Sequence, residues 1–487
     1  MSLRVLARSS ALYTVGNLAP KIGAFILLPI YLRFLTRSDY GVIALLTTLS
    51  GLIALVLTFG LDAALMRLHF DLQGRERARL YSTLAIFTLL SSTVLVAVFA
   101  VATGPFFPQL FTGIAFFPLG ALSLVIALIS TIAYVPSVLF RATGRAGYFL
   151  LYNLGTFILS SIVSVLLVVV AHLGPAGILL GQLTGAIVVF VVAIGLILSF
   201  GAPSFSRSRL FEALRFGLPL VPHGVSAWVL RLSDRSLIGL LIGLPVLQAQ
   251  AAIGVYSFGY QIGAVIALIA QSFNAAWSPY FFRVGNRPTA PLLYQQVITL
   301  VVAGLLVLAV GISALAPEIV NVVATSRYAQ AANVIPVVAF ASVFQGLYTM
   351  FVTAIFFMKR TAQLAAFTVS AALLNVALNF IFIPRIGIMG AAWSTLIAYA
   401  LWAMATAWYA MRQYPIRIDA ARLAPLATVA VAAVFASMAA STSVAQPAQA
   451  IIHVVIAAAY AIVAAAVALP ALSNLRGLTG TMASEQV

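Results

Sequence analysis

Long apolar runs recur along the chain and alternate with short segments that hold most of its arginines. About 20 apolar residues in an α-helix, at 1.5 Å per residue, cross the roughly 30 Å hydrocarbon core of a bilayer. The pattern therefore predicts an all-α integral membrane protein with fourteen transmembrane helices. We expect the helices near residues 10–34, 41–66, 80–103, 113–140, 148–171, 176–200, 217–243, 252–281, 292–316, 330–357, 362–383, 388–411, 422–441 and 449–470.

The second half of this pattern repeats the first. Residues 220–223 (LVPH) echo residues 18–21 (LAPK), and Gly254 stands in the second repeat where Gly41 stands in the first. Spans one to six thus correspond to spans seven to twelve. Because six is even, the two halves have the same orientation and form a parallel repeat, an arrangement that places substrate between the halves.

This repeat predicts four parts of the chain. Residues 1–203 form a first lobe, residues 217–412 a second lobe, and residues 413–487 two additional helices with a cytoplasmic tail. The connection 204–216 alternates basic and apolar residues, which predicts an amphipathic cytoplasmic helix at the membrane surface. A solvated basic loop is the alternative for this connection.

Composition supports a membrane protein. Hydrophobic residues make up 63% of the 487-residue chain and charged residues only 7%, which excludes a soluble fold. The chain has no cysteine, so disulfides and thiolate metal sites are excluded.

The net charge of +17 is distributed in a way that favours a membrane topology over nucleic-acid binding. The basic residues stand singly or in small groups, mostly in connections expected on the cytoplasmic side. We therefore expect both termini in the cytoplasm and no nucleic-acid partner. The first apolar run is too long for a signal peptide and is expected to remain as a span.

The seventh span carries ionisable residues that lipid penalises. The run 217–243 includes His223, Arg231, Asp234 and Arg235. A charge at the bilayer centre costs roughly 2.5–3.5 kcal/mol, so such residues normally face a bundle interior or a water-filled cavity. At about 100° per residue, His223 and Asp234 lie on nearly the same face of the helix. The segment therefore predicts a polar cleft between the halves.

Polar residues also follow one face of the first span, where Asn17 and Lys21 stand one turn apart. If the repeat is symmetric, Lys21 faces His223 across the inner part of the cleft. Arg33 and Arg235 then lie nearer the outer side. These residues predict a row of cations along the transport path.

Three segments carry a resemblance to a known family. Residues 28–41 (LPIYLRFLTRSDYG), 233–235 (SDR) and 254–260 (GVYSFGY) resemble the polysaccharide-transporter, O-antigen flippase branch of the multidrug/oligosaccharidyl-lipid/polysaccharide flippase superfamily. The resemblance implies two six-helix lobes in a V, alternating access, and transfer of a lipid-linked sugar from the inner to the outer leaflet of the bacterial inner membrane. In related lipid II flippases the two extra C-terminal helices form a groove for the lipid tail. Residues 421–472 are long enough to form such a groove, and a role in helix packing is the alternative.

The sign of the charges favours an anionic substrate. A polyprenyl-pyrophosphate-linked sugar presents about two negative charges, which Lys and Arg bind as charge-assisted pairs, whereas a cationic drug requires acidic groups. The candidate substrate-binding residues are Asn17, Lys21, Arg33, Asp62, His223, Arg231, Asp234 and Arg235. Structural roles are open for several of them. Asp62 could pair with Arg67 and Asp234 with Arg231, while His223 could be a packed side chain and Arg33 could extend to the outer interface.

Four residues resemble the sodium site of lipid II flippases. Asp234, Asn375, Asn379 and Thr395 are expected at similar depths and offer the oxygen ligands that hard cations prefer. The resemblance is incomplete, because Asn379 stands where those flippases have a second carboxylate. A hydrogen-bonded network that joins helices is the alternative. Protons or the membrane potential are the other candidate driving forces, and no cofactor is expected.

Other functions remain as alternatives. An enzyme of lipid-linked sugars would need a large outer loop, and every outer connection is short. A primary pump is excluded because Lys21 and Lys359, the only lysines, do not stand in a Gly-rich phosphate loop. A multidrug antiporter of the same superfamily and a lipid II flippase are the competing readings. Expected partners are an undecaprenyl-pyrophosphate-linked glycan and membrane lipids, with a polysaccharide polymerase or glycosyltransferase as further candidates, and the chain is expected to be a monomer.

Overall fold

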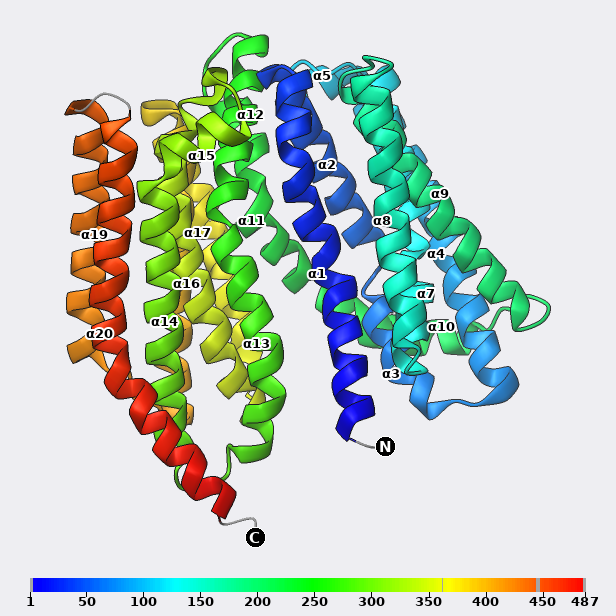
Figure 1. The fold of residues 1–487 in the computed structure, drawn as a ribbon. Helices are drawn as coiled ribbons and strands as arrows, with labels where there is room; N and C mark the ends of the chain where they lie inside the picture. The colour runs from blue at the N-terminus through cyan, green and yellow to red at the C-terminus, as the bar shows by residue number, and fades with distance from the viewer. Residues whose placement is uncertain (1–2, 361, 444–446, 485–487) are drawn as a thin grey trace. The chain divides into compact units, whose positions relative to one another are not determined.

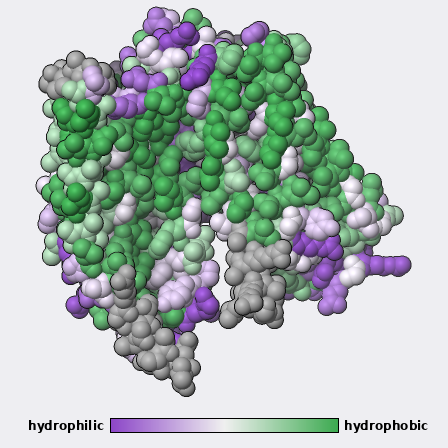
Figure 2. Space-filling view, viewed as in Figure 1, coloured by the Kyte–Doolittle hydropathy of each residue, from purple (hydrophilic) through white to green (hydrophobic). Residues whose placement is uncertain are grey.

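A computed structural model describes residues 3–360, 362–443 and 447–484. Every regular element among these residues is a helix, which confirms the all-α fold. The chain forms two compact units, residues 1–254 and 255–487. Apolar side chains cover the visible lengths of the helices and hydrophilic ones gather at helix ends (Figure 2), as expected of helices that cross a membrane.

Among its described residues, the first unit contains eleven α-helices and the start of a twelfth (Figure 1). They are α1 (Leu3–Phe34), α2 (Arg37–Leu57), α3 (Leu61–Asp71), α4 (Gly74–Thr103), α5 (Phe107–Leu110), α6 (Ala121–Ser130), α7 (Tyr134–Ala142), α8 (Ala146–Val169), α9 (Pro175–Ser199), α10 (Arg207–Gly217), α11 (Val221–Leu241) and α12 (Val246–Gly263). The helix α1 packs against α8, and α11 packs against α2.

The second unit contains the rest of α12 and eight further helices. They are α13 (Val265–Val284), α14 (Ala290–Ala314), α15 (Ala316–Val323), α16 (Ala331–Phe357), α17 (Ala362–Ile386), α18 (Ile388–Gln413), α19 (Ala420–Ser443) and α20 (Ala448–Ser484). The last two, orange and red in Figure 1, lie side by side against α14 and bury Leu426, Val434 and Tyr460 in the core of this unit.

Thirteen stretches of the described residues are long and apolar enough to cross a membrane. They include every span expected from the sequence except the seventh. That segment forms α11, a helix of 21 residues. Its three charged residues, Arg231, Asp234 and Arg235, make it too polar to be identified as a membrane span from length and composition. A multi-pass membrane protein is therefore confirmed, while the count of fourteen stays a prediction.

Local sequence explains where the helices of the first unit begin and break. The helix α2 begins with a capping box, in which Thr36 and Asp39 each bond the main-chain N–H of the other at 3.0–3.1 Å. It ends where Phe59 and Gly60 take φ values of 52° and 67°. Glycine adopts this left-handed conformation without strain, so the chain turns there and starts α3.

Candidate functional site

The charged residues of α11 differ in their exposure. Asp234 is fully buried and Arg235 nearly so, whereas Arg231 is exposed. Arg231 Nε donates to the main-chain oxygen of Ala227 at 3.1 Å, and Arg235 Nη1 donates to the main-chain oxygen of Arg231 at 3.3 Å. Each guanidinium is thus held along its own helix, and Arg231 keeps donors directed away from protein.

The polar residues of α1 are exposed as well. Asn17 Nδ2 donates to the main-chain oxygen of Tyr13 at 3.0 Å, and Lys21 and Arg33 lie exposed further along the helix. Lys21 and His223 form no hydrogen bond or ion pair with each other in the described structure. Their expected position on opposite sides of a cleft stays a prediction.

His223 lies near the start of α11 and is half-buried. Its Nδ1 is buried and has no hydrogen-bond partner among the described residues. A packed histidine normally has both ring nitrogens satisfied or exposed, because an unsatisfied buried polar atom costs about 1–3 kcal/mol. His223 Nδ1 is therefore an unsatisfied buried atom in this conformation.

Asp62 is exposed in the first turn of α3. The suggested pairing with Arg67 is wrong, because Arg67 binds the carboxylate of Asp71 at 2.8 Å. The physical reason is helical geometry. Residues four apart lie on the same face of a helix, whereas residues five apart do not. Asp62 therefore remains available as a site residue.

The four residues of the predicted sodium site are all fully buried, but they belong to different units. Asp234 lies in the first unit, whereas Asn375 and Asn379 lie on α17 and Thr395 on α18 of the second. Asn379 Nδ2 donates to Asn375 Oδ1 at 3.1 Å, and Asn375 Nδ2 has no partner in the described structure. The two amides therefore face each other as the sequence predicted, and their relation to Asp234 stays a prediction.

Two glycines that correspond in the sequence repeat lie against each other in the first unit. A Cβ atom on Gly41 would lie 1.9 Å from the main-chain oxygen of Gln250, and one on Gly254 would lie 2.1 Å from that of Arg37. The Gln250 side chain continues this contact, since its Oε1 accepts from Ser38 Oγ at 2.6 Å. The backbones of α2 and of the start of α12 are therefore in direct contact. Only glycine allows so close an approach, because it has no side chain.

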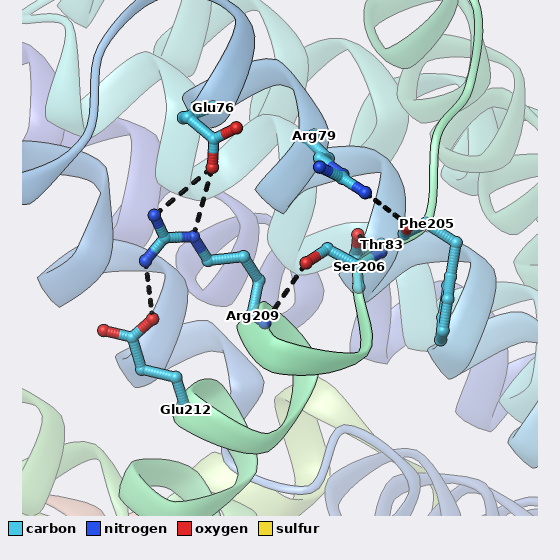
Figure 3. A network of polar contacts seen from close by, with 7 residues as sticks. All are labelled: Glu76, Arg79, Thr83, Phe205, Ser206, Arg209 and Glu212. Carbon is cyan, nitrogen blue, oxygen red and sulfur yellow. Dashed lines mark hydrogen bonds and ion pairs between the residues drawn. The ribbon is translucent and has the colours of Figure 1, made fainter.

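The linker forms α10, which packs against α3 and α4. Figure 3 shows how it is held: Arg209 lies between Glu212 at 2.9 Å and Glu76 of α4 at 3.2 Å. These carboxylates, Glu212 foremost, raise the pKa of the Arg209 guanidinium. Leu210 and Ala213 are buried while Phe211 is exposed, so one face of α10 packs on the protein, and its place at a membrane surface stays a prediction.

Two ionisable residues outside the predicted site are also brought together. His453 of α20 is fully buried and contacts Glu318 of α15. They are 135 residues apart in the chain, so no local spacing indicates the contact. The available signal was the place of His453 in an apolar run, because ionisable residues within membrane-spanning runs are rare and usually functional.

Comparison with known proteins gives a consistent set of matches. A family model described as Polysaccharide biosynthesis protein matches residues 30–333. The probable low-salt glycan biosynthesis flippase Agl15 of Haloferax volcanii is 23% identical over 414 residues, which cover 81% of each chain.

Solved structures share the fold. The lipid II flippase MurJ in an inward closed conformation matches with a TM-score of 0.68 and 15% identity, over 92% of this chain and 98% of that one. A Vibrio cholerae MATE transporter matches with a TM-score of 0.59 and 11% identity, over 84% of this chain and 96% of that one. At these identities the structures establish the fold alone.

Proposed function

Because the chain belongs to the polysaccharide biosynthesis protein family, we propose that it is a flippase for a polyprenyl-pyrophosphate-linked oligosaccharide. It would move an O-antigen or exopolysaccharide repeat unit from the inner to the outer leaflet of the bacterial inner membrane. The relatives it matches are flippases and transporters rather than enzymes, which supports transport without a chemical step.

The observation that carries this proposal is the exposure of Lys21 and Arg231 on α1 and α11, two helices long enough to cross a membrane. Lipid would penalise each of these charges by roughly 2.5–3.5 kcal/mol. A water-filled path that admits a diphosphate removes this cost, because ammonium and guanidinium groups bind phosphate oxygens by charge-assisted hydrogen bonds. In this proposal Asn17 and His223 Nδ1 add neutral contacts, and Arg33 and Arg235 act further along the path.

The acidic residues have a separate role in this proposal. Asp234, with Asn375, Asn379 and Thr395, would bind a monovalent cation such as sodium that accompanies the conformational cycle. The test is transport with sodium replaced by choline at fixed potential and pH, in wild type and in Asp234→Asn. Transport that does not depend on sodium in the wild type would remove the cation from the proposal and leave the flippase function intact.

A lipid II flippase is the second candidate, and one observation favours it. The match to MurJ covers 92% of the chain and therefore extends to the C-terminal helix pair, whereas the MATE transporter match covers 84%. Lipid II is also a polyprenyl pyrophosphate, so the same cations would bind it.

Complementation separates the candidates. The chain should restore surface polysaccharide to a strain that lacks its O-antigen flippase and should fail to support growth of a strain depleted of its lipid II flippase. The opposite result would assign lipid II as substrate. If the chain reaches normal levels in the membrane, fails to complement either strain and makes cells resistant to drugs, it would be a multidrug antiporter.

A further inference from the structure

One face of α10 is exposed and carries two arginines with a phenylalanine between them. Arg207, Phe211 and Arg215 stand four residues apart, so their side chains lie on the same side of the helix. All three are exposed, and the exposed fraction of Phe211 is 58%. The guanidinium carbon of Arg207 lies 5.5 Å from the centre of the Phe211 ring. The face therefore combines positive charge with an exposed aromatic ring.

The two arginines of this face carry uncompensated charge. The third arginine of α10, Arg209, lies between the carboxylates of Glu212 and Glu76, which balance its charge within the protein. Arg207 and Arg215 form no ion pair with any residue that the structure describes. The exposed face of α10 thus offers two positive charges to a ligand from outside the chain.

A neighbouring arginine and a second phenylalanine extend this face. Arg79 of α4 is exposed, and its Nη2 donates to the main-chain oxygen of Phe205 at 3.2 Å, two residues before Arg207. The Phe205 side chain is 47% exposed and points away from the carboxylate contacts of the linker (Figure 3). We call five residues together the α10 surface: Arg79, Phe205, Arg207, Phe211 and Arg215.

The α10 surface lies where membrane-spanning helices end. The candidate span α9 ends at Ser199 and α11 begins at Val221, so α10 lies between the ends of these two helices. In Figure 1 it runs across the ends of neighbouring helices rather than along them. Leu218 and Leu220, which follow α10, are 47% and 43% exposed. Exposed apolar side chains at this level are favourable in the headgroup region of a bilayer, where an amphipathic helix buries them.

We propose that the α10 surface binds anionic phospholipids, with the lipid phosphates on its arginines and its two phenylalanine rings among the upper parts of the acyl chains. Guanidinium groups bind phosphate oxygens by paired, charge-assisted hydrogen bonds. Arg207 and Arg215 are eight residues apart, about 12 Å along the helix at 1.5 Å per residue, so each binds a phosphate of its own. The proposal does not depend on which substrate the protein carries.

The aromatic residues favour a lipid over other anionic partners. An acidic protein segment or a free phosphate would neutralise the arginines but would leave Phe205 and Phe211 in water. A zwitterionic phospholipid places a cationic group beside its phosphate, so the arginines favour a lipid with a net negative charge. The chain passes from α10 into α11 through residues 218–220. A lipid bound to α10 therefore also holds the start of the helix that carries Arg231.

The direct test measures contact between α10 and each kind of lipid. The chain has no cysteine, so Ser208→Cys gives a single labelling site at an exposed position of α10 and leaves the α10 surface intact. In nanodiscs, a fluorophore at this position should be quenched more strongly by brominated phosphatidylglycerol than by the same amount of brominated phosphatidylcholine. Equal quenching by the two lipids would contradict phosphate recognition. Quenching by neither lipid would show that α10 lies away from the membrane and would overturn the proposal.

Substitutions in the labelled protein separate phosphate binding from general attraction by charge. Arg207→Gln and Arg215→Gln should each raise the phosphatidylglycerol fraction needed for half-maximal quenching by about fivefold, the effect of one basic residue at an anionic surface. Arg67→Gln is the matched control, because Arg67 of the adjacent α3 is exposed but bonds Asp71 at 2.8 Å. An equal effect of Arg67→Gln would contradict the proposal. So would relief of the quenching by glycerol phosphate in the buffer, which would identify a site for a free phosphate.

Hydrogen exchange tests the same site in the unsubstituted protein. The amides of α10 should exchange more slowly in nanodiscs of phosphatidylglycerol than in nanodiscs of phosphatidylcholine, because a ligand that binds the folded helix stabilises it against local opening. The internal control is α15, which contains no basic residue and should exchange alike in both lipids. Equal exchange of α10 in the two lipids, or the same slowing in α15, would contradict the proposal.

Discussion

The helices α11 and α17 differ in the kind of polar residue that they carry. The helix α11 carries three charged residues within its length, one of them exposed, whereas the interior of α17 carries the neutral amides Asn375 and Asn379, both fully buried. A charge needs water, a counter-ion or a ligand beside it, whereas the neutral amides of α17 bond each other and leave Asn375 Nδ2 without a partner in the described structure. The difference supports the proposal that the cations of α11 bind substrate, and it gives the amides of α17 a role in packing and in the proposed cation site.

We expect changes in α11 to lower transport without lowering stability, and changes in α17 to lower stability and to affect transport only when sodium is present. Gly41, which has a structural role alone, is the reference for both. Four substitutions test this difference, in order of decreasing expected effect.

Gly41→Ala is the structural reference. The new methyl group would overlap the main-chain oxygen of Gln250, and a backbone cannot move aside as a side chain can. We expect the free energy of unfolding to fall by about 3 kcal/mol, the upper end for overpacking. Gly155→Ala is the control, because a Cβ at Gly155 meets open space. If both variants unfold at the same temperature, the glycine contact contributes nothing.

Arg231→Gln should lower transport by about tenfold to hundredfold, because charge-assisted hydrogen bonds contribute about 1.5–3 kcal/mol. The unfolding temperature should stay unchanged, since Arg231 is exposed. Arg385→Gln is a closely matched control. Arg385 is also exposed and also donates to the main-chain oxygen four residues earlier, but it lies at the end of α17. Normal transport by Arg231→Gln, or equal loss in both variants, would break the contrast.

Asn379→Ala should lower the free energy of unfolding by about 1–3 kcal/mol, because it leaves the buried Asn375 amide without its partner. Transport per folded molecule, measured with choline in place of sodium, should change little. Asn153→Ala serves as control, since Asn153 is half-buried and bonds only the main-chain oxygen of Phe149. A large loss of transport at normal stability would instead place Asn379 in the transport machinery.

Glu76→Gln should have the smallest effect. Its contact with Arg209 lies at the surface, where ion pairs contribute about 0–1 kcal/mol and weaken in salt. Thermal unfolding at low and high salt should differ from wild type by less than that amount, and transport should be normal. A stronger effect would mean that the fixation of α10 on α4 takes part in the transport cycle.

The sequence predicted the fold class well because membrane insertion imposes a simple rule on every helix. A span needs a long apolar run, and such runs can be read without knowing which helices touch. The same rule identified α11 as a helix of mixed character, since Arg231, Asp234 and Arg235 interrupt its apolar run. The amide pair Asn375 and Asn379 was equally readable, because residues four apart share a helix face.

Contacts between distant segments could not be read in this way. One local alternative was wrong as well: an Asp62–Arg67 pair was considered, but Asp71 stands four residues from Arg67 and has the better helical spacing. The repeat marked Gly41 and Gly254 as equivalent residues but gave no sign that they touch. His453 and Glu318 stand in different apolar regions, and only the tertiary packing of α20 near α15 brings them together.

The central proposal is that the cations of α1 and α11 bind an anionic lipid during transport. The direct measurement is flipping of a polyprenyl-pyrophosphate oligosaccharide in proteoliposomes with an imposed membrane potential. Outward movement of two negative charges from a negative interior gains roughly 2.3 kcal/mol per charge for each 100 mV. Flipping should slow when the potential is collapsed, and Arg231→Gln should lower the rate at every potential. Flipping at the same rate with and without a potential, in both proteins, would contradict it.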